Sequence, residues 1–161
     1  MQDRQIERWE TIVFAELTTP VLYALLRLRS EVFVVEQQCV FLDIDGLDES
    51  AVHVLGWSQG QLVATARCMP VGYSGFTEAS IGRVATGASV RGSGAGHVLM
   101  HLSIAALHQN WGVQPIRIGA QAHLENFYQK HGFVKGSKPY LEDGIVHIEM
   151  LRPALPASNQ P

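Results

Sequence analysis

The chain has 161 residues, of which 47% are hydrophobic and 17% charged, a balance typical of one globular domain and far from that of a disordered chain. Its net charge of −3, from 12 basic and 15 acidic side chains, argues against a nucleic-acid partner, which would require a concentrated basic patch. The longest apolar runs, such as residues 32–35 and 104–107, fall well short of the roughly 18 residues that a membrane span needs. We therefore expect one cytoplasmic domain over residues 1–152, with no membrane partner, and a flexible tail over residues 153–161.

Neither the cysteines nor the acidic residues have the spacing of a metal site. Cys39 and Cys68 match no zinc or redox motif, and we expect both to be buried thiols. Three aspartates crowd one short segment and invite comparison with a calcium loop: Asp43, Asp45 and Asp48. Aligning the glycine of this segment with the EF-hand glycine puts Phe41 and Val52 at the first and twelfth ligand positions, so we expect no metal. The segment then forms either a solvated loop or a rim that attracts an amine.

The first half of the chain predicts a strand, a helix and a hairpin. Residues 11–15 have strand character, and the run Thr18-Thr19-Pro20 is a helix start, with apolar residues at helical spacing up to about Val34. Residues 36–50 are expected to form a loop. Two β-rich stretches, residues 51–57 and 62–69, flank a short glycine-containing connection and predict an antiparallel hairpin.

The second half alternates strands and helices. A strand is expected over residues 78–86, followed by a glycine-dense turn over 87–96 and a long helix that ends near Gly112. The remaining expected elements are strands at 116–121, 133–134 and 145–151 and a helix at 124–130. This order favours a mixed α/β (α+β) domain, with one sheet layer and helices on both faces.

The glycine-dense turn predicts an anion site, because the first N–H groups of a helix lack partners and lie at the positive end of its dipole. Its spacing does not fit the common nucleotide loops. A Rossmann fingerprint would need glycine where His97 stands, and a P-loop would need lysine where Ser93 stands.

The run Arg91-Gly92-Ser93-Gly94-Ala95-Gly96 instead resembles the R/Q-x-x-G-x-G/A loop of the GNAT N-acetyltransferase superfamily. Tyr128-Gln-Lys-His-Gly132-Phe133 resembles its second signature, Y-x-x-x-G-F, in the right order along the chain. Segments near residues 31–53 and 120–150 resemble the ElaA-like branch in particular. The resemblance implies a single GNAT-like domain with a mixed, mostly antiparallel sheet. It also implies acetyl transfer from acetyl-CoA to a primary amine of a small molecule or protein, by direct attack in a ternary complex.

The same resemblance assigns the cofactor-binding residues. Backbone groups of Val84, Ala85 and Thr86 would pair with the pantetheine arm, and the pyrophosphate would be held by Arg91, Gly92, Ser93, Gly94, Ala95 and Gly96. Tyr128 would protonate the leaving thiolate, with a core aromatic as the alternative interpretation. Gln121 stands where an asparagine that contacts the cofactor is frequent, and Asn126 is an alternative amide donor.

The general base stays open. Arg83 occupies a region where some members of the superfamily carry a glutamate, so that assignment does not transfer. The catalytic candidates are Glu36 and His53, with Asp48, Glu142 and His147 as further polar residues in the branch-specific segments. The sequence leaves the identity of the amine and a homodimer open. The alternative function is a non-catalytic acyl-CoA-binding or regulatory module.

Overall fold

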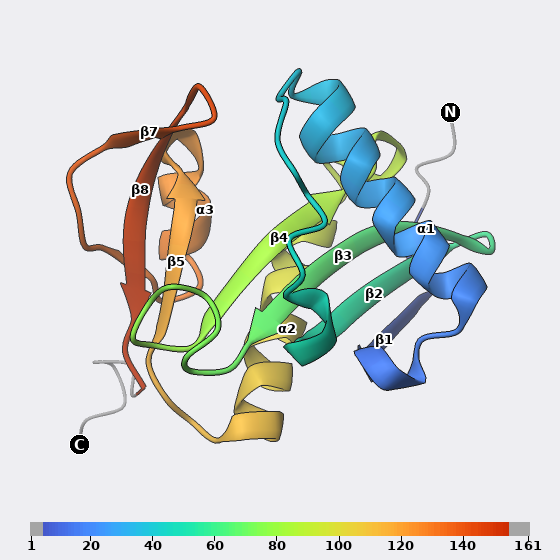
Figure 1. Ribbon diagram of the computed structural model, residues 1–161, viewed down its shortest axis with the longest axis horizontal. Helices are drawn as coiled ribbons and strands as arrows, with labels where there is room; N and C mark the ends of the chain where they lie inside the picture. Colours follow the sequence, from blue (N-terminus) through green and yellow to red (C-terminus); the bar gives the residue numbers. More distant parts are fainter. Residues whose placement is uncertain (1–4, 155–161) are drawn as a thin grey trace.

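Two antiparallel sheets set side by side form the framework of the protein, seen in a computed structural model that describes residues 5–154 (Figure 1). The first sheet has the order β1-β2-β3-β4, and in the second β8 pairs with β5, β6 and β7. The strands of the first are β1 (Arg8–Val13), β2 (Val52–Ser58), β3 (Gln61–Met69) and β4 (Ser80–Thr86). Those of the second are β5 (Ile116–Gln121), β6 (Val134–Lys135), β7 (Tyr140–Glu142) and β8 (Ile145–Arg152).

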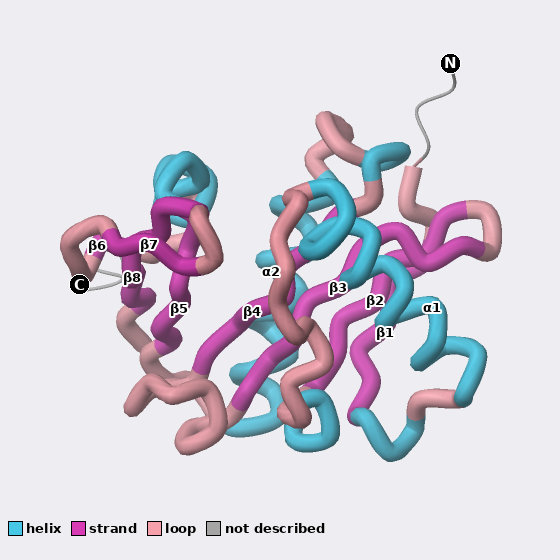
Figure 2. The backbone as a smooth tube through the Cα atoms, turned by 45° about the horizontal axis from the view of Figure 1, so that its top comes forward, coloured by secondary structure: helices cyan, strands magenta, loops and turns pink. Residues whose placement is uncertain are grey.

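Helices cover both faces of the first sheet, as the sequence predicts (Figure 2). On one face lies α1 (Thr19–Arg29), which the Thr18 hydroxyl caps by accepting from the N–H of Val21 at 3.4 Å. A π-helical turn, Ser30–Glu36, prolongs α1 beyond the expected end near Val34. The opposite face carries α2 (Ala95–Trp111), while the short α3 (Glu125–Gln129) lies beside the second sheet.

The core lies between α2 and the sheets. Leu99, Met100 and Leu107 of α2 are completely buried. Beneath them β3 contributes small residues, Ala64 and Ala66, in the same apolar cluster, so the helix can approach the sheet closely. The N-terminus of α2 is thereby held firmly against β3 and β4.

The sheet is not one continuous layer, which corrects the prediction of a single sheet. The two halves meet through one parallel bridge, Ala79 to Ile116, where the Arg117 N–H donates to the Ala79 carbonyl at 2.9 Å. Beyond this point β4 and β5 diverge, leaving an opening between them (Figure 1). The sequence pattern gives the two strands but contains no signal for their divergence, because each pairs fully on its other edge.

Most other expected elements are confirmed, with shifted ends. The hairpin of β2 and β3 turns at Gln59 and Gly60, both at positive φ. The first strand is Arg8–Val13, earlier than expected, because residues 14–16 form a 3-10 turn. β7 was not predicted, and β6 begins one residue later than predicted. From residue 155 onward the expected tail lies outside the described residues.

Candidate active site

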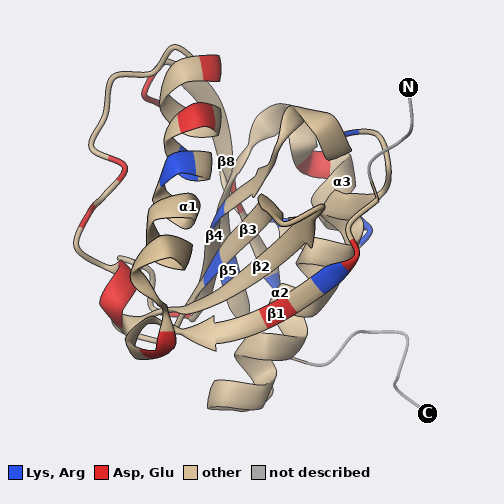
Figure 3. Ribbon diagram, turned by 90° about the vertical axis from the view of Figure 1, so that its right-hand side faces the viewer, with Lys and Arg blue, Asp and Glu red and all other residues tan. Residues whose placement is uncertain are grey.

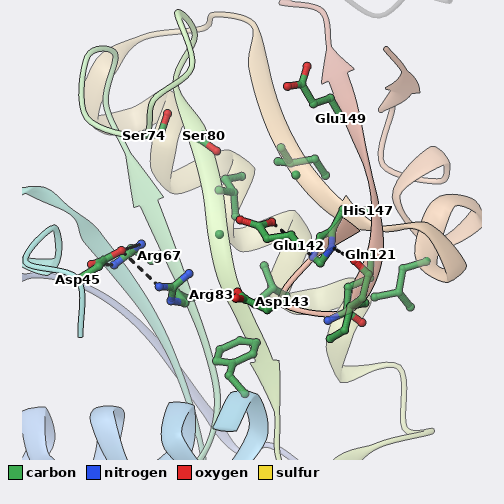
Figure 4. Close-up of a pocket in the computed structure, with 18 of the residues that line it drawn as sticks. Asp45, Arg67, Ser74, Ser80, Arg83, Gln121, Glu142, Asp143, His147 and Glu149 are labelled. Atoms are coloured by element: carbon green, nitrogen blue, oxygen red, sulfur yellow. Dashed lines mark hydrogen bonds and ion pairs between the residues drawn. The ribbon is translucent and has the colours of Figure 1, made fainter. Parts of the chain in front are cut away.

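A cavity of about 670 Å³ occupies the opening between the sheets (Figure 4). One wall is formed by β3, β4 and residues 37–47, and the other by β5, β7 and β8. Val84 and Tyr128 both line it, so the cavity extends from the strand expected to hold the pantetheine arm to the expected acid.

A bulge shapes the edge of β4 that faces this cavity. Arg83 and Val84 together oppose Ala66 of β3, and Arg83 has φ +48°, a conformation that a non-glycine residue seldom adopts. After the bulge the Gly87 N–H donates to the Val63 carbonyl at 2.7 Å. Main-chain groups alternate in direction along a strand, so those of Val84 and Thr86 face away from β3 toward the opening. This edge can pair with an extended, amide-bearing ligand.

The glycine loop has the backbone that an anion site requires. Gly92 and Gly94 have φ of +80° and +84°, and a Cβ built on either meets no atom within 4 Å, so the space before the loop is open. Gly94 caps α2 without a side-chain hydrogen bond, which leaves N–H groups of the first turn free for a ligand. Gly96 faces α3, where a Cβ would lie in ordinary contact, 3.4 Å from the ring of Phe127.

Arg91 is already engaged within the protein. Its Nε and Nη2 donate to the Thr86 carbonyl at 3.0 and 2.8 Å, and Nη2 forms an ion pair with Oε2 of Glu36 at 2.7 Å. Glu36 therefore lies at the glycine loop, and it is not among the residues that line the cavity. This location does not fit the expected role of Glu36 as a base for the acceptor.

Tyr128 lies in α3 and is 8% exposed. Its ring packs edge-on against Phe127 and Phe133, with ring centroids 5.0 and 5.9 Å away. Its hydroxyl makes no hydrogen bond to another described residue, and burial raises the pKa of Tyr128 to about 12. The phenol therefore remains protonated at neutral pH and can donate into the cavity.

The two amide candidates lie in different surroundings. Gln121, at the end of β5, lines the cavity opposite His147 of β8. Asn126 is exposed on α3 and does not line the cavity. The geometry favours Gln121 over Asn126 as a contact to a ligand in the opening.

The acidic loop is neither a solvated loop nor an amine-attracting rim, because its aspartates are paired with arginines. Arg29 of α1 reaches Asp43 at 2.9 Å and Asp48 at 2.5 Å, and both aspartates are buried. The other ion pairs of this cluster join Arg67 to Asp45 at 2.8 Å and to Asp48 at 3.2 Å, and Arg83 to Asp43 at 2.8 Å and to Asp45 at 3.3 Å. Three arginines thus balance three aspartates, fixing the loop beside α1 (Figure 3).

His53 belongs to the surroundings of this ion-pair cluster. It is 1% exposed on β2, and its Nε2 lies 3.0 Å from the carbonyl oxygen of Asp48. Burial lowers the pKa of His53, against the raising effect of the Asp48 contacts, so the ring is neutral. Neither His53 nor Asp48 lines the cavity, so a role as acceptor base does not fit their position.

The cavity wall formed by β7 and β8 carries carboxylates that are not paired with an arginine or lysine of the described chain. Glu142 and Asp143, at the turn between β7 and β8, have no lysine or arginine partner among residues 5–154. His147 lies next to them, with Nε2 3.8 Å from Glu142 and Nδ1 2.8 Å from the Ile145 carbonyl. A carbonyl only accepts, so Nδ1 carries a proton, and Nε2 is the nitrogen that bears the lone pair in the neutral form of the ring. This places a basic nitrogen at the cavity wall.

The lining of the cavity is acidic on balance. Its charged members are two arginines, Arg67 and Arg83, and four carboxylates, Asp45, Glu142, Asp143 and Glu149. This surplus of carboxylates attracts cations to the opening.

The arginines of the cluster and the lining residues Glu149 and Tyr140 were not predicted. One signal was present: Arg67 is the single charge inside the segment ATARCM. A charged residue in such a strand is buried only when it is paired. The two cysteines are buried free thiols, as expected, with Cys39 Sγ donating to the Asp143 carbonyl at 3.3 Å.

A split between two parallel strands, a glycine loop at a helix start and a buried phenol together define the acyl-CoA-dependent acyltransferases. Residues 33–152 match the family described as acetyltransferase (GNAT) domain, and the chain belongs to this family. It is 42% identical over 151 residues to Protein ElaA of Escherichia coli. The aligned region covers 92% of this chain and 98% of that protein. The crystal structure of E. coli ElaA superposes with a TM-score of 0.85, at 42% identity over 92% of this chain and 99% of that one.

A second solved structure supports the same class. An acyl-CoA N-acyltransferase from Pseudomonas aeruginosa is 43% identical, with a TM-score of 0.84 over 90% of this chain and 99% of the other. The family and fold support acyl-CoA-dependent acyl transfer. Across residues 5–154, no helix is long and apolar enough to cross a membrane. The same part of the chain contains no group of three or more His, Cys, Asp or Glu side chains that could hold a metal ion.

Proposed function

We propose that the protein transfers an acetyl group from acetyl-CoA to the primary amine of a cationic acceptor bound in the cavity between the sheets. The observation that carries the proposal is that one cavity joins the free edge of β4 at Val84 to the Tyr128 hydroxyl and to the acidic wall of β7 and β8. The thioester would lie at the Val84 edge, with the pyrophosphate at Gly92 and Gly94.

His147 is the residue best suited to take the proton of the acceptor. An ammonium has no lone pair, so the amine must lose a proton before it attacks. Nε2 of His147 faces the cavity as an acceptor, and Glu142 at 3.8 Å stabilises the ring once it is protonated. This proposal replaces Glu36 and His53 as the base.

Tyr128 acts at the other end of the reaction. The amine nitrogen bonds to the thioester carbonyl carbon, and the carbon–sulfur bond breaks with its electron pair on sulfur. The protonated phenol of Tyr128 then donates to the thiolate, and the second proton, which the nitrogen loses as it becomes the amide, restores the phenol. Direct attack needs both substrates in one ternary complex, and the cavity of about 670 Å³ would hold the thioester end of acetyl-CoA together with the amine.

Release of free CoA tests the proposal against a non-catalytic acyl-CoA-binding module. The wild type is incubated with acetyl-CoA and a panel of primary amines, and the thiol released is measured. The variant His147→Gln should lower kcat by about 10²-fold or more, while the exposed His123→Gln serves as the matched control. Binding of acetyl-CoA without release of CoA by any amine contradicts transfer and favours the binding module.

A further inference from the structure

The cavity wall on β8 presents two polar groups in one row. His147 and Glu149 are two residues apart on a strand, so both side chains face the cavity, whereas Ile148 between them is buried in the core. Two residues of strand span about 6–7 Å. Figure 4 shows His147 beside Glu142, with Glu149 farther along the wall toward Ser74 and Ser80.

The negative charge of Glu149 is only partly neutralised by its arginine partner. It shares Arg117 with Glu78, at distances of 3.4 and 2.7 Å respectively, so two carboxylates surround one guanidinium and the trio carries a net charge of −1. Of the three, Glu149 lines the cavity. One cation placed there would neutralise the trio.

An unpartnered hydroxyl lies at the same end. Ser80, at the start of β4, is 6% exposed and lines the cavity, yet its side chain makes no hydrogen bond to a described residue. A hydroxyl in this position can accept from an N–H donor. The Glu149 carboxylate and the Ser80 hydroxyl are thus two hydrogen-bond acceptors at the end of the cavity remote from His147 (Figure 4).

The wall between the two ends carries a glycine and aromatic rings. Gly119 of β5 lies opposite Glu149 in the strand register, and a Cβ there would stand 3.0 Å from the Tyr140 hydroxyl and 4.0 Å from the ring of Phe76. Tyr140 stacks on His147 with ring centroids 5.9 Å apart. Its pKa is raised by burial and by the neighbouring carboxylates. Aromatic rings along this wall suit a short alkyl chain.

We propose that the acceptor is a diamine or a larger polyamine, with one nitrogen at His147 and Glu142 and a second, cationic nitrogen at Glu149 and Ser80. Five bonds of about 1.5 Å in an extended chain advance about 6 Å, which matches the row on β8 and corresponds to the nitrogens of 1,4-diaminobutane. The inference rests on the proposed function, because the first nitrogen is the one that receives the acetyl group.

An acceptor with a carboxylate at its second end fits the cavity less well. Arg67 and Arg83 are the cationic residues that line the cavity, and both are paired with Asp45, Arg83 also with Asp43. Their charges are therefore compensated before any ligand binds. The uncompensated charge belongs to Glu142, Asp143 and Glu149, all on the other wall.

The test compares three acceptors at fixed acetyl-CoA: 1,4-diaminobutane, butylamine and 4-aminobutanoate. We expect kcat/KM for the diamine to exceed that for butylamine by about tenfold or more, the effect of one charge-assisted hydrogen bond, and 4-aminobutanoate to be the poorest. In Glu149→Gln the ratio of diamine to butylamine should fall toward one. Glu31→Gln removes an exposed carboxylate of the π-helical turn that pairs with Arg27 of α1 at 3.0 Å, and it should keep the wild-type ratio.

The outcomes separate the two proposals. CoA release with butylamine but no preference for the diamine, a preference for 4-aminobutanoate, or an unchanged ratio in Glu149→Gln overturns the diamine inference and leaves acetyl transfer standing. No CoA release with any amine overturns the proposed function. In that case binding of 1,4-diaminobutane, measured by calorimetry on wild type and Glu149→Gln, decides the inference: equal affinities, or no binding to either, overturn it.

Discussion

Glu36 and Arg91 form an ion pair of 2.7 Å that joins the end of the π-helical turn to the glycine loop. The same Arg91 nitrogen also donates to the Thr86 carbonyl at 2.8 Å, so it is shared between an acid and the free edge of β4. A pyrophosphate at the loop would meet the Glu36 carboxylate as a like charge. Glu36 therefore opposes cofactor binding in electrostatic terms.

The variant Glu36→Gln should bind acetyl-CoA more tightly and keep its turnover. Removing one exposed like charge is expected to lower Kd by up to about fivefold, the scale of a surface ion pair. Calorimetric titration with acetyl-CoA measures the change, and Glu31→Gln is the control for loss of an exposed carboxylate–arginine pair. A large drop in kcat with unchanged affinity would instead restore Glu36 as the catalytic base.

The variant Gly94→Ala should weaken acetyl-CoA binding, because a side chain at φ +84° strains the turn and obstructs the approach of a pyrophosphate. Gly112, at the other end of α2, has φ +87° and also has open space around it. Gly112→Ala therefore carries at least as much strain far from the loop, because its φ of 87° and ψ of 161° suit glycine alone. We expect Gly94→Ala to lose about 1–2 kcal/mol of stability, Gly112→Ala to lose at least as much, and only Gly94→Ala to lose affinity; equal affinity in the two would contradict the phosphate-loop assignment.

The variant Tyr128→Phe should lower kcat and leave KM for acetyl-CoA nearly unchanged, since the ring packing against Phe133 is kept and only the hydroxyl is lost. A thiol of pKa about 8.5 leaves readily as thiolate, so the loss should fall near the lower end of the roughly 10²–10⁴-fold range of general acids. Steady-state CoA release is the measurement, with the exposed Tyr23→Phe as control. Wild-type turnover would make Tyr128 a packing residue.

The ion-pair cluster predicts a loss of stability in acid. Burial raises the pKa of Asp45, but the hydrogen bonds from Arg67 and from the Leu47 N–H outweigh it and bring the value from 3.8 to about 2. A pKa depressed by folding stabilises the fold above about pH 4, and this contribution disappears as the pH falls toward 2. Asp48 is shifted in the same direction.

The stability gap between wild type and Asp45→Asn should therefore be widest above pH 4 and narrow between pH 4 and pH 2. Urea unfolding of both proteins at several pH values measures this gap. A gap that is constant over this range would show that Asp45 keeps the same protonation state in the folded and unfolded chains.

The elements and the cofactor loop were predictable because they depend on local rules. The Thr18-Thr19-Pro20 start and the glycines at positive φ act within a few residues. Segment periodicity likewise gave the hairpin of β2 and β3. The phosphate-loop assignment of Arg91 to Gly96 stays a prediction, with an open backbone that suits it.

The wall of the cavity formed by β5, β7 and β8 was not predictable in the same way. Pairing of Arg29 with Asp48 joins residues far apart in the chain, and it removes the aspartates from the role that their sequence cluster suggested. His53 and His147 are alike in the sequence, each in a β-rich stretch, and only the fold separates a buried ring from one that lines the cavity. Their difference is tertiary, and single-sequence patterns contain no information on it.

The bridge between Ala79 and Ile116 connects two sheets that contribute different groups to the cavity. Under the proposed function, β4 on one side of it would supply the strand edge for acetyl-CoA, and residues 116–152 on the other side would supply the acidic groups around the amine. Because β7 and β8 make no ladder contact with β4, their side chains can be exchanged without altering the register of the cofactor-bearing strand. Under the proposed function, the charge that selects the amine can therefore change, by evolution or by engineering, through substitutions on the β7–β8 hairpin.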